Sequence, residues 1–206
     1  MKKNIFVALS IGLFLFSLKI SSKSIKKEPS AFTVLTDSIE QKLLNRVSII
    51  KQLVSTNSKY NKEIVFLIDM KIMSGKNRFF VYDLKNNKVI DQGLVAHGVG
   101  SGMSIGNLKF SNLPNSYCTS LGKYSIGSSY NGQYGKSYKL FGLDKTNNNA
   151  ISRNIVLHKY DKIPYDEQNI PICNSLGCPM INETYYKRIE KIIDSSKSPI
   201  ILGIYY

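Results

Sequence analysis

Asn154-Ile155-Val156-Leu157-His158 and Ser175-Leu176-Gly177-Cys178-Pro179 are the two stretches that decide this chain. The first is rich in β-branched and apolar residues, which predicts a buried strand that ends at His158. The second places Cys178 directly after a glycine, which permits a tight turn that aims backbone N–H groups at a developing oxyanion. The two stretches are separated by 16 residues (175 − 158 − 1).

Cys178 and His158 form the first candidate pair for catalysis. A cysteine nucleophile needs a base or a cation to activate its thiol, and imidazole is the usual partner. The chain has only two histidines, His97 and His158, so there are few ways to build such a pair.

The N-terminus predicts a secretory signal over residues 1–22. Lys2 and Lys3 precede an apolar run, Ile5–Leu18, and small polar residues follow it. The run is short for a membrane span, which needs about 20 apolar residues. We therefore expect an exported protein of the periplasm or cell envelope, with the signal cleaved near Ser22 and an uncleaved anchor as the alternative.

The formal net charge is +14, and removal of residues 1–22 with their three lysines leaves +11 (14 − 3). An exported protein rarely meets nucleic acid, so the expected partners are anionic envelope polymers and not DNA or RNA. A solvated basic surface without a partner is the plainer alternative, because the lysines are scattered.

The rest of the chain reads as one mainly β, α+β domain. Residues 23–31 suit a linker, and apolar residues at helical spacing predict an amphipathic N-terminal helix over 32–57. A short C-terminal helix is expected over 184–193. Strands are predicted at 64–69, 78–84, 88–96, 123–126, 137–141, 154–158 and 199–206, the second and third forming a hairpin.

Three cysteines in an exported chain raise the question of a disulfide. Cys173 and Cys178 are close enough in sequence to bridge, and such a disulfide would switch off any chemistry that uses the Cys178 thiol, whereas Cys118 suits a buried small side chain. A zinc site drawn from His158 and the three cysteines lacks the usual ligand spacing, so no metal is expected.

Further motifs extend the pattern along the chain: Val95-Ala96-His97-Gly98, Thr119-Ser120-Leu121-Gly122, Gly135-Lys136-Ser137-Tyr138, Arg153 and the two opening stretches. In order and spacing, residues 64–206 resemble the murein L,D-transpeptidase catalytic-domain family, in the branch whose cysteine motif reads S-x-G-C-P. Leu176 departs from the classical motif of that family, which has a second histidine at this position.

The resemblance implies a β-sandwich or barrel that acts on peptidoglycan stem peptides without a cofactor. Cys178 would attack the donor peptide and form a thioester, and His158 would serve as the base. The N–H groups of Gly177 and Cys178 would hold the oxyanion. An amine acceptor makes the reaction L,D-transpeptidation and water makes it L,D-carboxypeptidation; a non-catalytic envelope-binding module is the alternative from another class.

Five further residues are candidates for lining the site: His97, Ser120, Arg153, Ser175 and Leu176. Four of them have an ordinary structural alternative. His97 suits a structural role equally well, the two serines suit turns, and Arg153 suits an ion pair.

Overall fold

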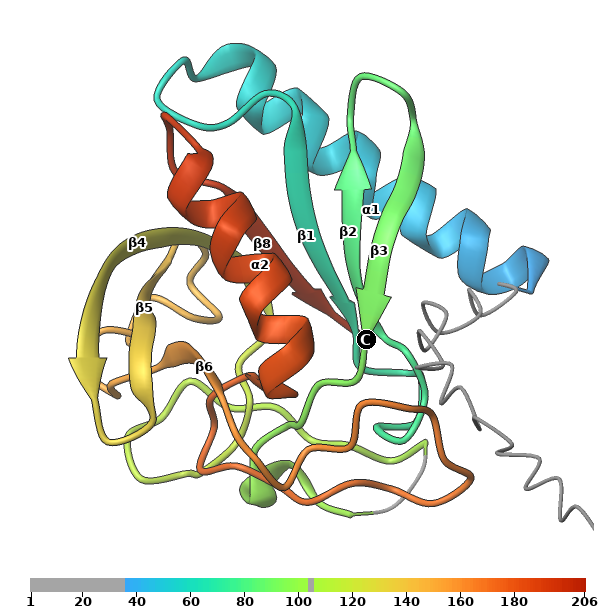
Figure 1. Ribbon diagram of the computed structural model, residues 1–206, viewed down its shortest axis with the longest axis vertical. Coiled ribbons are helices and arrows are strands. Elements are labelled where there is room, and N and C mark those ends of the chain that lie inside the picture. The colour runs from blue at the N-terminus through green and yellow to red at the C-terminus, as the bar shows by residue number, and fades with distance from the viewer. Residues whose placement is uncertain (1–35, 104–105) are drawn as a thin grey trace, which may run out of the picture. The chain divides into compact units, whose positions relative to one another are not determined.

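The computed structural model describes residues 36–103 and 106–206. The predicted export signal, the predicted linker and residues 32–35 of the predicted helix lie outside these residues. Within them, eight strands form one sheet in the order β3-β2-β1-β8-β4-β5-β6-β7. Two α-helices accompany the sheet (Figure 1). The expected mainly β, α+β fold is confirmed.

The bounds of the elements are α1 Asp37–Thr56, β1 Ile64–Asp69, β2 Phe79–Asp83, β3 Lys88–Gly93, η1 (a 3₁₀ turn) Val99–Ser101, β4 Gly122–Gly132, β5 Gly135–Gly142, β6 Val156–Lys159, β7 Met180–Ile181, α2 Glu183–Ser195 and β8 Ile201–Tyr205. Neighbouring strands are antiparallel except for β1 with β8 and β6 with β7, which run parallel. No helix in the described ranges has the length and apolar character to span a membrane.

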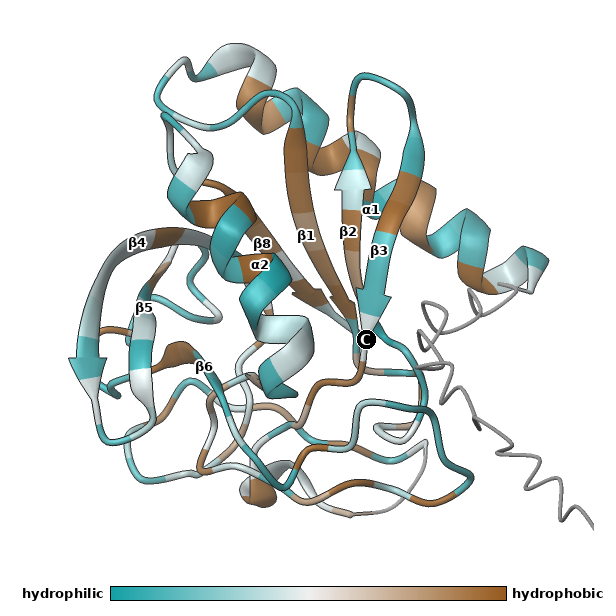
Figure 2. Ribbon diagram, viewed as in Figure 1, coloured by the Kyte–Doolittle hydropathy of each residue, from teal (hydrophilic) through white to brown (hydrophobic). Residues whose placement is uncertain are grey.

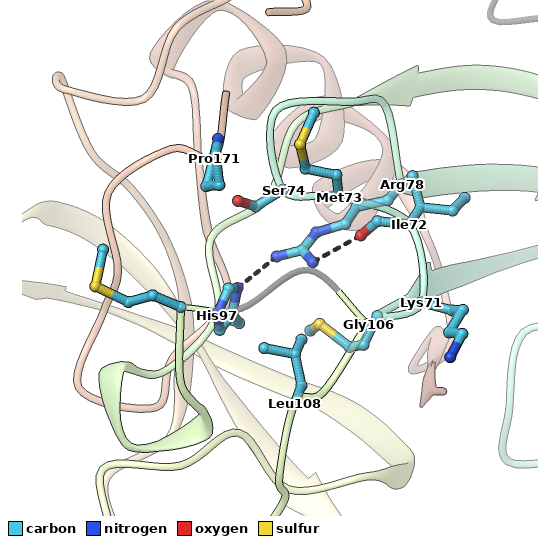
Figure 3. Close-up of a pocket in the computed structure, with 11 residues that line it drawn as sticks. Lys71, Ile72, Met73, Ser74, Arg78, His97, Gly106, Leu108 and Pro171 are labelled. Atoms are coloured by element: carbon cyan, nitrogen blue, oxygen red, sulfur yellow. Dashed lines mark hydrogen bonds between the residues drawn. The ribbon is translucent and has the colours of Figure 1, made fainter. Parts of the chain in front are cut away.

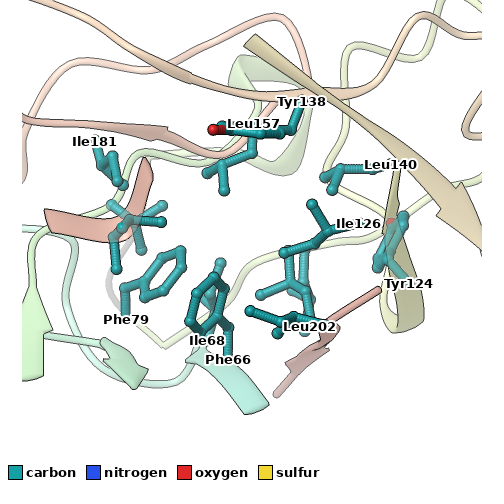
Figure 4. Packing of buried hydrophobic residues seen from close by; sticks show 14 of the residues in the cluster. Phe66, Ile68, Phe79, Tyr124, Ile126, Tyr138, Leu140, Leu157, Ile181 and Leu202 are labelled. Carbon is teal, nitrogen blue, oxygen red and sulfur yellow. The ribbon is translucent and has the colours of Figure 1, made fainter. Parts of the chain in front are cut away.

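Strand β1 is apolar along almost its whole length because both of its faces are covered. Successive side chains of a strand point to opposite faces. Val65 and Leu67 pack in the cluster that contains the buried side of α1, whereas Phe66 and Ile68 pack in the cluster that contains α2. Figure 2 shows the resulting apolar band along β1 and β8, and Figure 4 shows the second cluster from close by.

The cluster that contains α2 joins strands β1, β2 and β8 to strands β4, β5 and β6. Tyr124 and Ile126 of β4, Leu140 of β5 and Leu157 of β6 meet residues of β1, β2 and β8 in this core (Figure 4). Leu157 is fully buried, so the backbone of β6 on either side of it is held against the core. The candidate histidine is the next residue along this strand.

Helix α1 begins at Asp37, whereas the predicted helix covered residues 32–57. Thr36 has extended backbone angles and is a residue type favoured at a helix N-cap, and Asn57 is extended after the last turn. Apolar spacing continues upstream of Thr36 in the sequence, so periodicity alone cannot locate this boundary. The buried face of α1 consists of Leu43, Val47, Ile50 and Val54.

The predicted hairpin of β2 and β3 is confirmed, but β3 ends at Gly93 and not at residue 96. A side chain at Gly93 would lie 2.3 Å from the Tyr185 ring of α2, which packs directly on the strand there. The chain then leaves the sheet. Val95 pairs with Ile181 and Gly98 with Ser175, so this segment runs alongside the residues that lead into β7.

A buried Arg78 fixes the segment that follows β3. Its Nε and Nη2 donate to the carbonyl oxygen of Val95 at 3.0 and 2.8 Å, and its Nη1 donates to that of Ile72 at 3.0 Å. Nη2 also lies 2.9 Å from Nδ1 of His97 (Figure 3). Since the guanidinium can only donate, Nδ1 of His97 is the acceptor, and Nε2–H donates to the carbonyl of Gly102 at 2.8 Å.

The cavity beside Arg78 and His97 measures about 20 Å³, which is room for about one water molecule (Figure 3). Burial lowers the pKa of Arg78 to about 9, so the guanidinium remains charged at neutral pH. Burial and the neighbouring Arg78 cation both lower the pKa of His97. His97 is therefore a neutral structural histidine that holds the chain between β3 and η1.

Replacement of Ile50 by alanine tests the docking of α1. Ile50 is 2% exposed and packs over Gly203 of β8, so Ile50→Ala should lower the free energy of unfolding by about 2–5 kcal/mol. Ile49→Ala is the matched control, because Ile49 is 42% exposed, and it should change stability by less than about 1 kcal/mol. Urea unfolding measures both; equal losses would contradict the packing of α1 on the sheet.

The pH dependence of stability tests the Arg78–His97 contact. The folded-state pKa of His97 lies below its ordinary value of 6.5, so the unfolded chain binds the proton first as pH falls. Stability should be complete above pH 6.5 and fall below it, by at most about 1.4 kcal/mol per pH unit for each such histidine.

His158 also has a lowered pKa, so His97→Gln should remove only part of this slope. Urea midpoints measured between about pH 7.5 and 5.5 give the comparison, since most carboxylates titrate at lower pH. An identical slope in wild type and His97→Gln would show that the His97 ring is not buried beside a cation.

Candidate active site

The candidate site is a cleft of about 590 Å³ over the β6–β7 pair. Val156, His158 and Tyr160 line it, as expected for alternate residues on one face of a strand. Further lining residues come from the β4–β5 hairpin, from η1, from the chain just before β6, and from β7 and the segment before it: Val99, Tyr130, Gln133, Tyr134, Ser137, Asn154, Asn174, Ser175, Leu176, Cys178 and Met180.

The parallel pairing of β6 with β7 determines how Cys178 and His158 lie. His158 pairs with Met180, and Cys178 precedes Met180 by two residues, so Cys178 lies beside Val156. Neighbouring strands are about 4.8 Å apart and each residue advances about 3.3 Å, so same-face residues two positions apart have Cα atoms separated by roughly 8 Å. The thiol and the imidazole therefore face the same cleft.

The His158 ring is held in one tautomer and one plane. Its Nδ1 lies 2.9 Å from the carbonyl oxygen of Lys159, which can only accept, so Nδ1 carries the proton. The Tyr134 ring stacks on the imidazole with a centroid separation of 4.4 Å and an interplanar angle of 19°. Burial lowers the pKa of His158, so the ring is neutral at pH 7 with its lone pair on Nε2.

The Cys178 thiol rests against the backbone at the start of β6. Sγ lies 3.7 Å from the carbonyl oxygen of Asn154 and 3.5 Å from the backbone N of Val156. Across the part of the chain that the structure describes, no hydrogen bond joins Sγ to His158. Burial raises the pKa of Cys178, and the Val156 N–H and the Arg153 cation only partly oppose it. The resting pair is thus a neutral thiol and a neutral imidazole.

Gly177 makes the predicted tight turn. Its φ is +125°, in the region that favours glycine, and an added Cβ would lie 3.1 Å from Ile155 Cδ1 and 3.2 Å from the carbonyl oxygen of Cys118. The backbone angle strains any other residue here, and the close neighbours leave little space for a side chain. The turn delivers Cys178 to the cleft.

The two predicted oxyanion donors, the N–H groups of Gly177 and Cys178, differ in whether they already have a hydrogen-bond partner. The N–H of Gly177 already donates to Ser175 Oγ at 3.0 Å. The N–H of Cys178 has no hydrogen-bond partner among the described residues. Ser175 is itself fixed, since its N–H donates to the carbonyl of His97 at 2.9 Å and its carbonyl accepts from Val99 at 2.8 Å. One backbone donor beside the thiol is free to receive a charged oxygen.

Arg153 and Ser120 lie behind the cysteine turn and do not line the cleft. Arg153 donates to the carbonyls of Cys118 and Ser111 at 2.6 and 3.0 Å and to Ser120 Oγ at 3.0 Å. Ser120 is buried against the Tyr124 hydroxyl at 2.9 Å. These contacts fix the segment around Cys118, against which Gly177 packs. Arg153 and Ser120 therefore stabilise the cysteine turn without entering the cleft.

The remaining predicted residues fall in different places. His97 does not line the cleft but contacts two residues that do: its carbonyl accepts from the Ser175 N–H at 2.9 Å, and its Nε2 lies 3.1 Å from Asn174 Nδ2. Leu176 is 70% exposed at the rim of the cleft. Cys118 is buried as expected. Cys118, Cys173 and Cys178 all have free thiols, and the Cys173–Cys178 switch stays a prediction.

Sequence reasoning missed the residues of the β4–β5 hairpin and Asn154. Tyr130 and Tyr134 enter the cleft from the hairpin, whose two-residue turn lies between Gly132 and Gly135. The Gly-Gln-Tyr-Gly run was the signal for this turn. Asn154 has a φ of +55°, a conformation that asparagine tolerates better than most residues, and only the structure shows its carbonyl at the thiol.

The solved structures that resemble the fold include the following three. The helical cell shape determining protein Pgp2 from Campylobacter jejuni is 13% identical with a TM-score of 0.45, over 69% of this chain and 47% of that chain. An L,D-transpeptidase from Stackebrandtia nassauensis gives 14% and 0.40 over 71% and 57%. One from Xylanimonas cellulosilytica gives 12% and 0.38 over 69% and 60%.

This chain spans about half the length of the Pgp2 chain that it matches. No curated protein sequence matches it. The sequence profile of the L,D-transpeptidase catalytic domain matches residues 36–202, a region that includes α1 and all of the sheet except the end of β8. The family expected from the sequence motifs is confirmed: this chain belongs to the L,D-transpeptidase catalytic domain family.

Proposed function

We propose that this chain is an exported cysteine acyltransferase that cross-links peptidoglycan stem peptides through a thioester on Cys178. The observation that supports this best is the cleft that Cys178 and His158 share: His158 pairs with Met180 of β7, and Cys178 lies two residues before Met180. Membership of the L,D-transpeptidase family supports the reaction class. The residue roles below follow from the chemistry of the side chains in this cleft.

His158 acts as the general base in this proposal. Its Nδ1–H is engaged by the Lys159 carbonyl, so only Nε2 can accept a proton. A lowered pKa keeps this nitrogen unprotonated at neutral pH. Rotation of the Cys178 side chain away from the Asn154 carbonyl brings the S–H toward Nε2, and hydrogen bonds of this kind commonly form only once substrate is bound.

Cys178 then attacks the carbonyl of the diamino-acid residue in the donor stem peptide. The thiol proton passes to Nε2 of His158 as the C–S bond forms, and the carbonyl oxygen becomes an oxyanion. The free N–H of Cys178 is available to donate to it, and one such donor typically contributes about 3 kcal/mol to transition-state stabilisation. Collapse returns the proton to the leaving terminal D-alanine and leaves the thioester.

An amine from a second stem peptide completes the reaction. It attacks the thioester carbonyl, gives its proton to His158 and releases the Cys178 thiol as the cross-link forms. Water in place of the amine makes the same intermediate yield a shortened stem, which is L,D-carboxypeptidation. The acceptor is thus what distinguishes the two activities at a single site.

The basic, apolar and small-residue order of residues 1–22 supports export to the cell envelope, where these peptides are found. The net charge of +11 left after residues 1–22 (14 − 3) suits an anionic envelope polymer as an additional partner. Leu176, exposed at the rim, gives the donor peptide an apolar contact where the classical motif has a histidine.

Variants of the thiol and the imidazole test the proposal in the full chain, incubated with purified muropeptides whose products are weighed by mass spectrometry. Cys178→Ala and Cys178→Ser should retain no more than a few per cent of activity, since a serine hydroxyl is far less acidic than a thiol. His158→Ala should slow acylation by roughly 10²–10⁴-fold.

Cys173→Ser is the matched control in reducing buffer, because Cys173 is an exposed thiol outside the cleft, and it should keep full activity. Dimers of muropeptides indicate transpeptidation, and shortened monomers indicate carboxypeptidation. Activity retained in Cys178→Ala would reject the nucleophile. If the wild-type protein left the muropeptide masses unchanged but bound purified peptidoglycan, it would instead be a non-catalytic envelope-binding module.

A further inference from the structure

Tyr134 occupies the tip of the β4–β5 hairpin directly above β6. Gly132 and Gly135 pair across the turn, and Gly135 has a φ of +79°, so the glycine takes the backbone conformation that the turn requires. An added Cβ at Gly135 would lie 3.5 Å from the side chain of Lys159, which shows how closely the turn approaches β6. The hairpin therefore carries a tyrosine ring to the strand that bears His158.

Two aromatic contacts fix the Tyr134 ring. It stacks on His158 with centroids 4.4 Å apart, and it meets the Tyr160 ring edge-on at 5.8 Å and 84°. His158 and Tyr160 are alternate residues on one face of the chain, so the tyrosine bridges both. The His158 residue is 3% exposed, whereas Tyr134 is 40% exposed. The exposed ring thus shields the face of the buried one.

The stack and the Lys159 hydrogen bond constrain the imidazole in complementary ways. The bond at Nδ1 holds one edge of the ring, and the stack fixes the ring plane about that edge. Nε2 is left without a hydrogen-bond partner among the described residues. A base that must accept a proton from Cys178 requires this nitrogen to be free and correctly oriented.

We propose that Tyr134 is the positioning residue for His158, and that its ring keeps the imidazole plane aligned for proton transfer from Cys178. The proposal rests on the base role given to His158 under the proposed function. A stacked aromatic pair favours the conformation in which the two rings are in contact by roughly 2- to 10-fold, in addition to the effect of burial. The tyrosine hydroxyl has no part in it, because the stack uses only the ring.

Several other ionisable groups lie around His158. Tyr134 packs on the ring and Tyr160 packs on Tyr134. The Cys178 thiol shares the cleft, and Lys159 follows His158 with its amine paired to Glu183 at 2.7 Å. Tyr130 lines the same cleft from β4. Burial dominates the lowered pKa of His158, and Tyr134 contributes part of that burial.

Three variants of the full chain distinguish the effect of the Tyr134 ring from the effects of its hydroxyl and of the hairpin as a whole. Tyr134→Ala removes the stack, Tyr134→Phe keeps it, and Tyr130→Ala removes a tyrosine of equal exposure, 40%, that makes no ring contact with His158. NMR titration of the imidazoles gives the first readout. Only two histidines contribute, and His97→Gln assigns them. The second readout is kcat and KM for muropeptide turnover.

In Tyr134→Ala, the pKa of His158 should rise toward 6.5 and kcat should fall roughly 2- to 10-fold, with KM changed by less than about twofold. Since the base must be unprotonated, the acid limb of the pH profile should move to higher pH. Tyr134→Phe should restore the wild-type titration and kcat. Tyr130→Ala should leave the titration of His158 unchanged.

An unchanged His158 titration and kcat in Tyr134→Ala would overturn the inference, as would a Tyr134→Phe variant that behaves like Tyr134→Ala. If Tyr130→Ala moved the titration equally, the hairpin as a whole and not the stack would be responsible, which also overturns it. The titration needs no turnover. An inactive protein with a Tyr134-dependent His158 pKa would therefore reject the proposed function and leave the stacking contact standing.

Discussion

The parallel pairing of β6 with β7 is the constraint on which the candidate site depends. His158 pairs with Met180, so the residue two positions earlier, Cys178, lies beside Val156 and faces the same cleft as the imidazole. A slip of one residue would send one of the two side chains to the opposite face. Leu157, which is buried in the core, and Gly177, whose backbone angle of +125° strains other residues, make such a slip costly.

The protein around this pair holds both groups neutral at rest. Burial lowers the pKa of His158 and raises that of Cys178, so the site contains a thiol and an imidazole instead of an ion pair. In the proposed reaction, proton transfer accompanies nucleophilic attack, which makes the orientation of Nε2 important. The Lys159 carbonyl fixes one edge of the ring and Tyr134 covers one face, so neighbouring residues provide this orientation.

Much of the scaffold could be predicted from the sequence because burial leaves a clear pattern. Strand β1 was expected at its observed bounds, and α2 was expected within three residues of its ends. Contacts between segments distant in sequence could not be predicted. His97 proved to be bound to Arg78, which lies 19 residues earlier in the chain. This contact does not follow from spacing, since it depends on how separate segments meet beside the sheet. The Gly177 N–H is engaged by Ser175, a local turn contact between residues two positions apart of the kind that serine favours.

The most direct test of the account is to trap the acyl-enzyme. The full chain is mixed with a muropeptide donor that carries a tetrapeptide stem, quenched in acid within the first turnovers, digested and mapped by mass spectrometry. The account predicts a thioester adduct, with the mass of the donor less D-alanine, on the peptide containing Cys178. Turnover without an adduct on Cys178, or with the adduct on Cys173, would contradict it.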